Sequence, residues 1–186
     1  MNLEKYGKPI FAIVVVVMVV SVSWLSYFYL GGGQEAFTGG GGTTPPPTAS
    51  LAPDFSYPAV GGGTVSLSAL KGKVVILDFM ATWCQPCKNQ IANLKTIYSE
   101  YSVQGVSIIS IDIDPQDSSQ HLTDYRTERG ATWQFVLDSN GVYLEPKYSA
   151  TSIPTIIIIN KNGEIAKRNV GPMSVEALKK AIDPLL

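Results

Sequence analysis

Cys84 and Cys87, three positions apart, are the residues of this chain best suited to chemistry. They are the only cysteines in the sequence, so each has only the other as an intramolecular disulfide partner. They follow residues 74–80, whose apolar run predicts a buried strand, and they precede residues 88–101, which predict a helix. Outward-pointing N–H groups at a helix start favour the thiolate form of a cysteine there. The pair predicts a redox switch, in which Cys84 attacks a partner's disulfide and Cys87 resolves the mixed disulfide.

Other uses of two cysteines fit the sequence less well. A zinc site needs four ligands, and the one histidine, His121, lies far along the chain. Attachment of a c-type haem needs a histidine directly after the second cysteine, where Lys88 stands. A structural disulfide more often joins distant segments, because closing a longer loop stabilises more. Pro86 adds support for the redox interpretation, since proline suits the first position of a helix. We therefore expect no metal and no cofactor.

Composition and charge argue against two further functions, nucleic-acid binding and calcium binding. The chain has 186 residues, enough for one domain with appendages, and its net charge is −1. Without a basic patch with interleaved aromatic residues, nucleic-acid binding is not expected. Asp112, Asp114 and Asp117 form an acidic segment that could bind calcium, but the glycine and terminal glutamate of an EF-hand are absent. We expect this segment to be a solvated loop.

The N-terminus predicts a membrane anchor. Residues 10–30 carry no charge and are numerous enough to cross a bilayer as a helix. Lys5 and Lys8 precede this run, and the next cation is Lys71, so the N-terminus should be cytoplasmic and the rest of the chain outside. A cleaved signal peptide is the alternative, but its apolar region would usually be shorter. We expect a single-pass protein of the cell membrane.

The segments after this anchor differ sharply in composition. Residues 31–51 are rich in glycine and proline and predict a linker, which would hold a domain about 25 Å from the membrane on average. We therefore expect a cytoplasmic N-terminus at 1–9, an anchor at 10–30, a linker at 31–51 and one domain at 52–186.

The domain itself alternates between predicted strands and helices. Beyond the elements around the cysteines, we expect strands at 106–113, 134–137, 153–159 and 164–169, and helices at 118–129, 142–148 and 174–184. A short helical turn is expected at 65–70, capped by Ser66. This order predicts an α/β fold with a mixed central sheet and helices on both faces. Right-handed crossovers would place Cys84 at the C-terminal edge of strand 74–80.

Three segments of the sequence resemble a known family. DFMATWCQPC at 78–87, SIPTIIIINKNGEI at 152–165 and VSLSALKGKVVILDF at 65–79 are similar to the thioredoxin-fold proteins, and more narrowly to the membrane-anchored TlpA/ResA-like thiol–disulfide oxidoreductases. The resemblance covers residues 52–186 and implies a thioredoxin-like fold. Residues 115–148 resemble the extra strand and helix of that subgroup.

The resemblance also implies roles for residues around the cysteines. It implies a cis peptide bond between Ile153 and Pro154, in a loop whose backbone pairs with the substrate chain. It places Asp78 as a buried acid behind Cys87. Because a carboxyl in an apolar strand should have a raised pKa, Asp78 could take a proton from Cys87 as that thiol attacks. The alternative for Asp78 is a buried polar group with satisfied hydrogen bonds.

Three further residues are expected to contact the substrate. Trp83 resembles the family's aromatic shield over the dithiol, and its alternative is ordinary core packing. Gln85 and Pro86 lie between the cysteines, and Gln85 replaces the glycine or glutamate often found there, which leaves partner choice open.

Many thioredoxins carry a lysine on the strand beside the buried acid, whereas residues 106–114 contain none. The charge balance around the acid is therefore open as well.

The resulting functional prediction is an extracytoplasmic reductase of protein disulfides. The family suggests apocytochrome c as substrate, and a reductant outside the cell needs a membrane electron donor. Strong oxidants stabilise their thiolate, and Gln85–Pro86 offers no cation, so reduction is favoured over an oxidase or isomerase.

A peroxiredoxin-type peroxidase would need a Pro-x-x-x-Thr pattern that Thr82 does not complete. A Cu(I) chaperone could use the two thiols, but lacks a companion site rich in Met or His.

Overall fold

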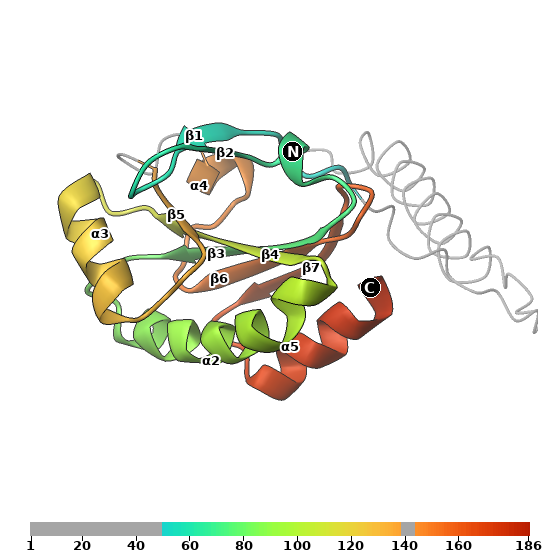
Figure 1. Cartoon of the computed structure of the whole chain (residues 1–186). Helices are drawn as coiled ribbons and strands as arrows, with labels where there is room; N and C mark the ends of the chain where they lie inside the picture. The colour runs from blue at the N-terminus through green and yellow to red at the C-terminus, as the bar shows by residue number, and fades with distance from the viewer. Residues whose placement is uncertain (1–49, 139–143) are drawn as a thin grey trace, which may run out of the picture. The chain divides into compact units, whose positions relative to one another are not determined.

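A mixed five-stranded sheet forms the centre of the domain. The computed structural model describes residues 50–138 and 144–186 (Figure 1). Within them the strand order of this sheet is β5-β4-β3-β6-β7, and β1 pairs with β2 in a separate hairpin. The strands are β1 Ser56–Pro58, β2 Thr64–Ser66, β3 Val74–Met80, β4 Val106–Asp112, β5 Gln134–Leu137, β6 Thr155–Ile159 and β7 Ile165–Val170. The helices are α2 Gln85–Tyr101, α3 Ser119–Glu128, α4 Leu144–Lys147 and α5 Val175–Ile182. Short 3-10 turns occupy Ser68–Leu70, Ser102–Gln104 and Asp183–Leu185.

The central strand β3 is buried along its whole length because both faces of the sheet are covered. It runs parallel to β4 and antiparallel to β6. The β3–β4 register places Asp78 beside Ser110 and Met80 beside Asp112. Since side chains alternate between faces, Asp78, Ser110 and Asp112 all lie on the same face of the sheet.

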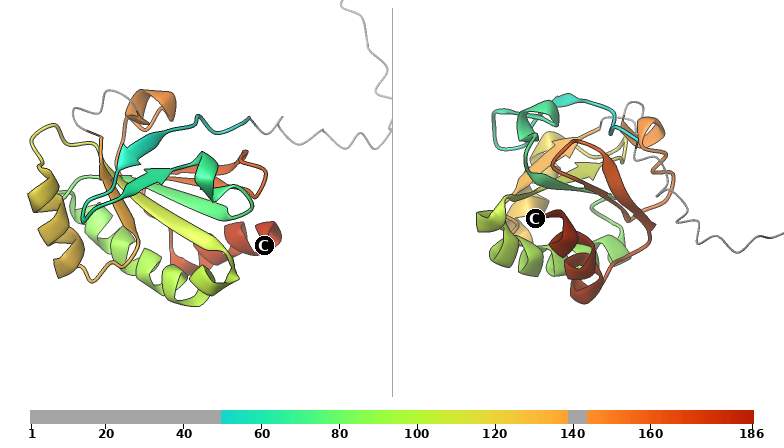
Figure 2. Two further views of the ribbon diagram at one scale, coloured as in Figure 1. Left: turned by 45° about the horizontal axis from the view of Figure 1, so that its top comes forward. Right: turned by 90° about the vertical axis from the view of Figure 1, so that its right-hand side faces the viewer.

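The two faces are covered by different elements (Figures 1 and 2). Helices α2, α3 and α5 cover one face, where Ile76 and Met80 of β3 pack with residues such as Leu94, Leu122 and Leu178. The β1–β2 hairpin and the single turn α4 cover the other, where Leu77 and Phe79 pack with residues such as Phe55, Val65 and Tyr148. The predicted mixed sheet is confirmed, and helices do lie on both faces, although a hairpin provides much of the second layer.

Several element boundaries differ from the sequence prediction. Helix α2 begins at Gln85, three residues before the predicted start, because Cys84 takes the N-cap position and proline fits the first turn. Ser66 was expected to cap a helical turn, but it belongs to β2 and pairs with Ser56. The 3-10 turn that follows begins after Leu67, without a side-chain cap. The cap prediction was therefore wrong, since strand pairing claims the residue.

The N-terminal predictions fall mostly outside this region. Residues 1–9, the expected anchor at 10–30 and nearly all of the expected linker lie outside the described residues. At its end, Ser50 O accepts from Ile165 N at 2.9 Å, and Leu51 forms an isolated bridge with Glu164. These two residues therefore pair with the domain. Across residues 50–138 and 144–186, no helix is both long and apolar enough to cross a membrane.

Candidate active site

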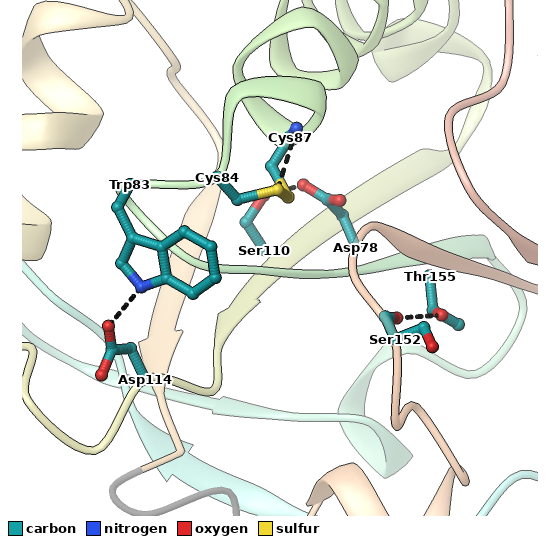
Figure 3. The surroundings of a disulfide bond; sticks show 8 residues. All are labelled: Asp78, Trp83, Cys84, Cys87, Ser110, Asp114, Ser152 and Thr155. Atoms are coloured by element: carbon teal, nitrogen blue, oxygen red, sulfur yellow. Dashed lines mark hydrogen bonds between the residues drawn. A yellow bond between two sulfur atoms is a disulfide. The ribbon is translucent and has the colours of Figure 1, made fainter.

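A disulfide joins Cys84 and Cys87 at the start of α2, where β3 has ended (Figure 3). Cys84 is the N-cap of the helix, and its Sγ accepts a hydrogen bond from the backbone N–H of Cys87 at 3.2 Å. The first turn of a helix carries N–H groups without backbone partners and the positive end of the helix dipole. Both would stabilise a thiolate on Cys84 once the disulfide is reduced.

The two sulfur-bearing residues differ in access to solvent. Cys84 is 4% exposed to solvent, and Cys87 is fully buried. Gln85 and Pro86, between them, are exposed. A nucleophile or an electrophile that arrives from solvent therefore meets Cys84 first, and Cys87 is reached only from within the site.

Asp78 is a fully buried carboxyl behind this disulfide. Figure 3 shows its side chain pointing toward the sulfur atoms. Ser110 Oγ donates to Asp78 Oδ2 at 3.0 Å, and Trp133 Nε1 donates to Ser110 Oγ at 3.0 Å. The other oxygen, Oδ1, has no hydrogen-bond partner among the described residues. The alternative of a carboxyl with satisfied hydrogen bonds therefore does not describe this site.

Burial controls the protonation of Asp78. Removal from water raises its pKa from 3.8 to about 7, against the opposing effect of the hydrogen bond from Ser110. No lysine lies on β4, so the hydroxyl of Ser110 is the group that meets this carboxyl from the neighbouring strand. A carboxyl with a pKa near neutrality can both accept and release a proton at physiological pH.

Trp83 does not pack in the core, so that alternative was wrong. Its side chain lies beside the disulfide on the protein surface, and the residue is 66% exposed. Its indole Nε1 donates to Asp114 Oδ2, which holds the ring toward the loop after β4 (Figure 3). Thr82, one residue earlier, donates to Asp117 Oδ2 at 2.8 Å. The segment before Cys84 is thus bonded to the loop at 113–117 at two points.

The acidic segment is more ordered than the solvated loop expected from sequence. Asp112 is fully buried, and desolvation together with the neighbouring Asp117 raises its pKa to about 8. Asp112 Oδ1 accepts from the N–H of Asp114, while Asp117 pairs with His121. Within the described ranges, no group of three His, Cys, Asp or Glu side chains is arranged to hold a metal ion. The segment instead supports the residues that precede the dithiol.

The loop that precedes β6 forms another part of the site's surroundings. The peptide bond between Ile153 and Pro154 is cis, as predicted. Thr155 Oγ1 donates to Ser152 O at 2.6 Å, and Gly171 N donates to Pro154 O at 2.8 Å. Arg168, on β7, donates through both of its terminal nitrogens to the carbonyls of Tyr148 and Ser149. These contacts fix the loop from two sides.

Sequence reasoning missed four residues of this arrangement: Ser110, Trp133, Asp114 and Arg168. Ser110 could have been found by aligning the two predicted parallel strands from their first residues, which places Ser110 beside Asp78. Arg168 and Trp133 gave no such signal, because their partners are brought to them by tertiary packing.

A family model and individual relatives match this chain. The model of the AhpC/TSA family matches residues 48–168. Sporulation thiol-disulfide oxidoreductase A of Bacillus subtilis (strain 168) is 32% identical over 111 residues, which cover 59% of this chain and 67% of that protein. Thiol-disulfide oxidoreductase ResA of the same organism is 32% identical over 123 residues, 66% of this chain and 67% of that protein.

Solved structures give the same result at the level of the fold. The crystal structure of StoA from Bacillus subtilis superimposes with a TM-score of 0.61 at 29% identity, covering 71% of this chain and 98% of that one. A thiol:disulfide interchange protein of the thioredoxin family from Chlorobium tepidum TLS superimposes with a TM-score of 0.67 at 24% identity, covering 75% and 98%. The chain therefore belongs to the thioredoxin-fold AhpC/TSA family and, within it, to the thiol–disulfide oxidoreductases related to ResA and StoA.

Proposed function

We propose that this chain is a membrane-anchored, extracytoplasmic oxidoreductase that reduces disulfides in other proteins. The observation that carries the proposal is the Cys84–Cys87 disulfide at a helix N-terminus, backed by the buried carboxyl of Asp78. A dithiol in this position can give two electrons to a partner and close to the disulfide that the structure contains.

In the first step the Cys84 thiolate attacks one sulfur of the substrate disulfide. A bond forms between Cys84 Sγ and that sulfur, and the second substrate sulfur leaves as a thiolate. In the second step Cys87 attacks Cys84 Sγ, which forms the Cys84–Cys87 disulfide and releases the first substrate sulfur. The substrate gains two electrons and the enzyme loses two.

Asp78 serves the second step. Cys87 must lose a proton to become a nucleophile, and it has no exposed surface through which water could accept that proton. Asp78 points toward the sulfur atoms, and its pKa of about 7 lets the carboxylate form accept a proton near neutral pH. The same carboxyl returns the proton when the dithiol is regenerated.

The substrate chain binds around Cys84. Trp83, Gln85 and Pro86 are exposed beside it. On the other side, the backbone at Ile153 and Pro154 pairs with the substrate strand, as it does in the family that the sequence resembles. The cysteine of the substrate then lies opposite the accessible sulfur.

We infer the reducing direction from the surroundings of Cys84. Among the described residues, its sulfur accepts a hydrogen bond from the Cys87 N–H alone, and Gln85–Pro86 places no cation next to it. Oxidants of this fold stabilise the thiolate so strongly that their potential rises to about −120 mV, whereas thioredoxin lies near about −270 mV. A Cys84 thiolate that is stabilised by the helix N-terminus but by no neighbouring cation is closer to that of the reductants.

The location rests on the N-terminal sequence. Residues 1–9 are cytoplasmic, 10–30 span the membrane and 31–51 connect to the domain at 52–186, which lies outside the cell. Because that compartment favours oxidation, a membrane protein must supply electrons to the dithiol. Apocytochrome c, whose cysteines must be reduced before haem attachment, is the substrate we propose.

Equilibration with glutathione tests the direction. The full-length chain in detergent is incubated in buffers of defined ratio of reduced to oxidised glutathione, and the fraction of Cys84–Cys87 disulfide is measured by thiol labelling. We expect a potential close to that of thioredoxin. A value near about −120 mV would assign the chain as an oxidase instead.

A further inference from the structure

An open groove of about 480 Å³ lies along the segment that precedes the dithiol. Trp83, the residue before Cys84, forms part of its lining, as does Ile153, the residue before the cis-proline. Asp114 and Ile113 line it from the loop after β4. A substrate held at Cys84 and along the cis-proline loop would thus place a neighbouring side chain next to this groove.

The indole of Trp83 is an exposed part of this lining, within reach of that side chain. Its Nε1 is bonded to Asp114 Oδ2, which fixes the ring, yet the residue remains 66% exposed. The face of an indole ring carries negative potential and attracts cations within about 6 Å of its centre. Such a surface binds a lysine or arginine side chain better than a neutral one.

Asp114 supplies the matching charge at the edge of the ring. Its Oδ1 accepts from the N–H of Gln116 at 2.8 Å, and its Oδ2 accepts from Trp83. Each carboxylate oxygen has two lone pairs, so both retain capacity for a further donor. The lining contains no lysine, arginine or histidine that would neutralise this carboxylate. Nearby, Asp117 is already paired with His121.

We propose that Trp83 and Asp114 form a subsite that selects disulfide substrates with a lysine or arginine next to the attacked cysteine. The proposal rests on the reductase function proposed above. The methylene groups of such a side chain would lie against Ile113 and Ile153, and its charged end would reach the indole face and the carboxylate. Asp114 would then be a specificity-determining residue rather than a catalytic one.

Three disulfide peptides test the subsite. They are identical except that each cysteine is preceded by Lys, Gln or Glu. The second-order rate of their reduction by the reduced full-length chain in detergent is measured. We expect the Lys peptide to react about three- to tenfold faster than the Gln peptide at low salt, and this ratio to shrink at about 0.5 M salt.

Substitutions then assign the effect to the groove. Asp114→Asn should bring the Lys-to-Gln ratio close to one, and Asp114→Lys should make the Glu peptide the faster of the charged pair. Glu128→Gln, which removes the same charge from an exposed position near the end of α3, should leave the ratio as in the wild type. Because each ratio compares two substrates of one protein sample, a partial loss of folding does not alter it.

The outcomes separate this proposal from the one on which it rests. Reduction of all three peptides at equal rates, or an unchanged ratio in Asp114→Asn, would overturn the subsite and leave the reductase function standing. Failure of the wild type to reduce any of the peptides would overturn both.

Discussion

Ser110 Oγ donates a hydrogen bond of 3.0 Å to Asp78 Oδ2, and within the described residues this is the only hydrogen bond to that carboxyl. The two residues face each other across the parallel strands β3 and β4. A single neutral donor cannot offset complete burial of a charge, which is why the pKa of Asp78 stays near 7. The pKa of Asp78 is therefore determined by its own burial and by the hydroxyl of Ser110 on the neighbouring strand.

Replacement of Asp78 by Asn should slow the second chemical step. A mixed disulfide is prepared on Cys84, and the release of the substrate thiol is followed from pH 5 to 9. The wild-type rate should rise with a midpoint near pH 7, as the carboxylate forms. Asp78→Asn should be about 10- to 100-fold slower at pH 7 and lack that midpoint. The same midpoint in both proteins would remove Asp78 from the mechanism.

Replacement of Ser110 by Ala should move the same midpoint upward. The hydroxyl favours the charged form of Asp78, so its loss raises the pKa of that carboxyl further. Ser110→Thr keeps a hydroxyl and serves as the control, with a midpoint close to that of the wild type. A downward shift in Ser110→Ala would contradict the hydrogen-bond geometry.

The oxidised protein should become less stable as the pH rises from about 4 to about 7. Asp78 has a pKa of about 7 in the folded chain against 3.8 as its ordinary value, so between these values the folded state holds the extra proton. The free energy of unfolding then falls with rising pH, by at most about 4 kcal/mol from this residue, and flattens above the folded pKa. Asp112, with a pKa of about 8, adds a loss of the same sign.

Urea unfolding of the oxidised full-length chain in detergent, at pH 5 and pH 8, measures this loss. Asp78→Asn cannot ionise, so its difference in stability between the two pH values should be smaller than that of the wild type. Equal differences in the two proteins would show that Asp78 titrates alike in the folded and unfolded chain.

Substitution of the buried cysteine should trap the physiological partner. In Cys87→Ser the Cys84 thiolate can still attack, but nothing resolves the mixed disulfide, so a covalent complex should accumulate on Cys84. Non-reducing electrophoresis followed by mass spectrometry identifies the partner. The double variant Cys84→Ser/Cys87→Ser is the matched control, and complexes that persist in it would be unrelated to the dithiol.

Loss of the Arg168 side chain should loosen the loop before the cis-proline. The guanidinium bonds the carbonyls of Tyr148 and Ser149, so Arg168→Ala should lower the free energy of unfolding by about 1 kcal/mol and weaken substrate binding. Urea unfolding and the KM for a disulfide peptide check this, with the neighbouring exposed Lys167→Ala as control. Equal effects of the two substitutions would show that the bonds to the loop contribute nothing.

The central elements could be predicted from sequence because their signals are local. Strand β3 lies at the predicted residues 74–80, since six of the seven buried positions in this run carry apolar side chains, with Asp78 as the exception. The cysteine pair and its place at a strand-to-helix junction followed from the same run. The caps of α3 and α5 at Ser118 and Ser174 also follow from local side-chain chemistry.

The parts that could not be predicted depend on contacts between distant segments. The assignment of Ser66 to a strand depends on pairing with β1. The burial of Asp112 depends on its position between β3 and β5, where it pairs with Met80 and Leu137. The bond from Trp83 to Asp114 links residues 31 positions apart. The hydrophobic periodicity of a short segment carries no information on contacts between distant residues. The polar contacts of the site could therefore be identified only in the structure.

The complete burial of Cys87 controls the order in which the two thiols react. A small oxidant that touches the surface meets Cys84 alone, and the enclosed sulfur joins in only after a covalent bond has formed there. Electrons of the reduced dithiol therefore pass only to a group that has first bonded to Cys84.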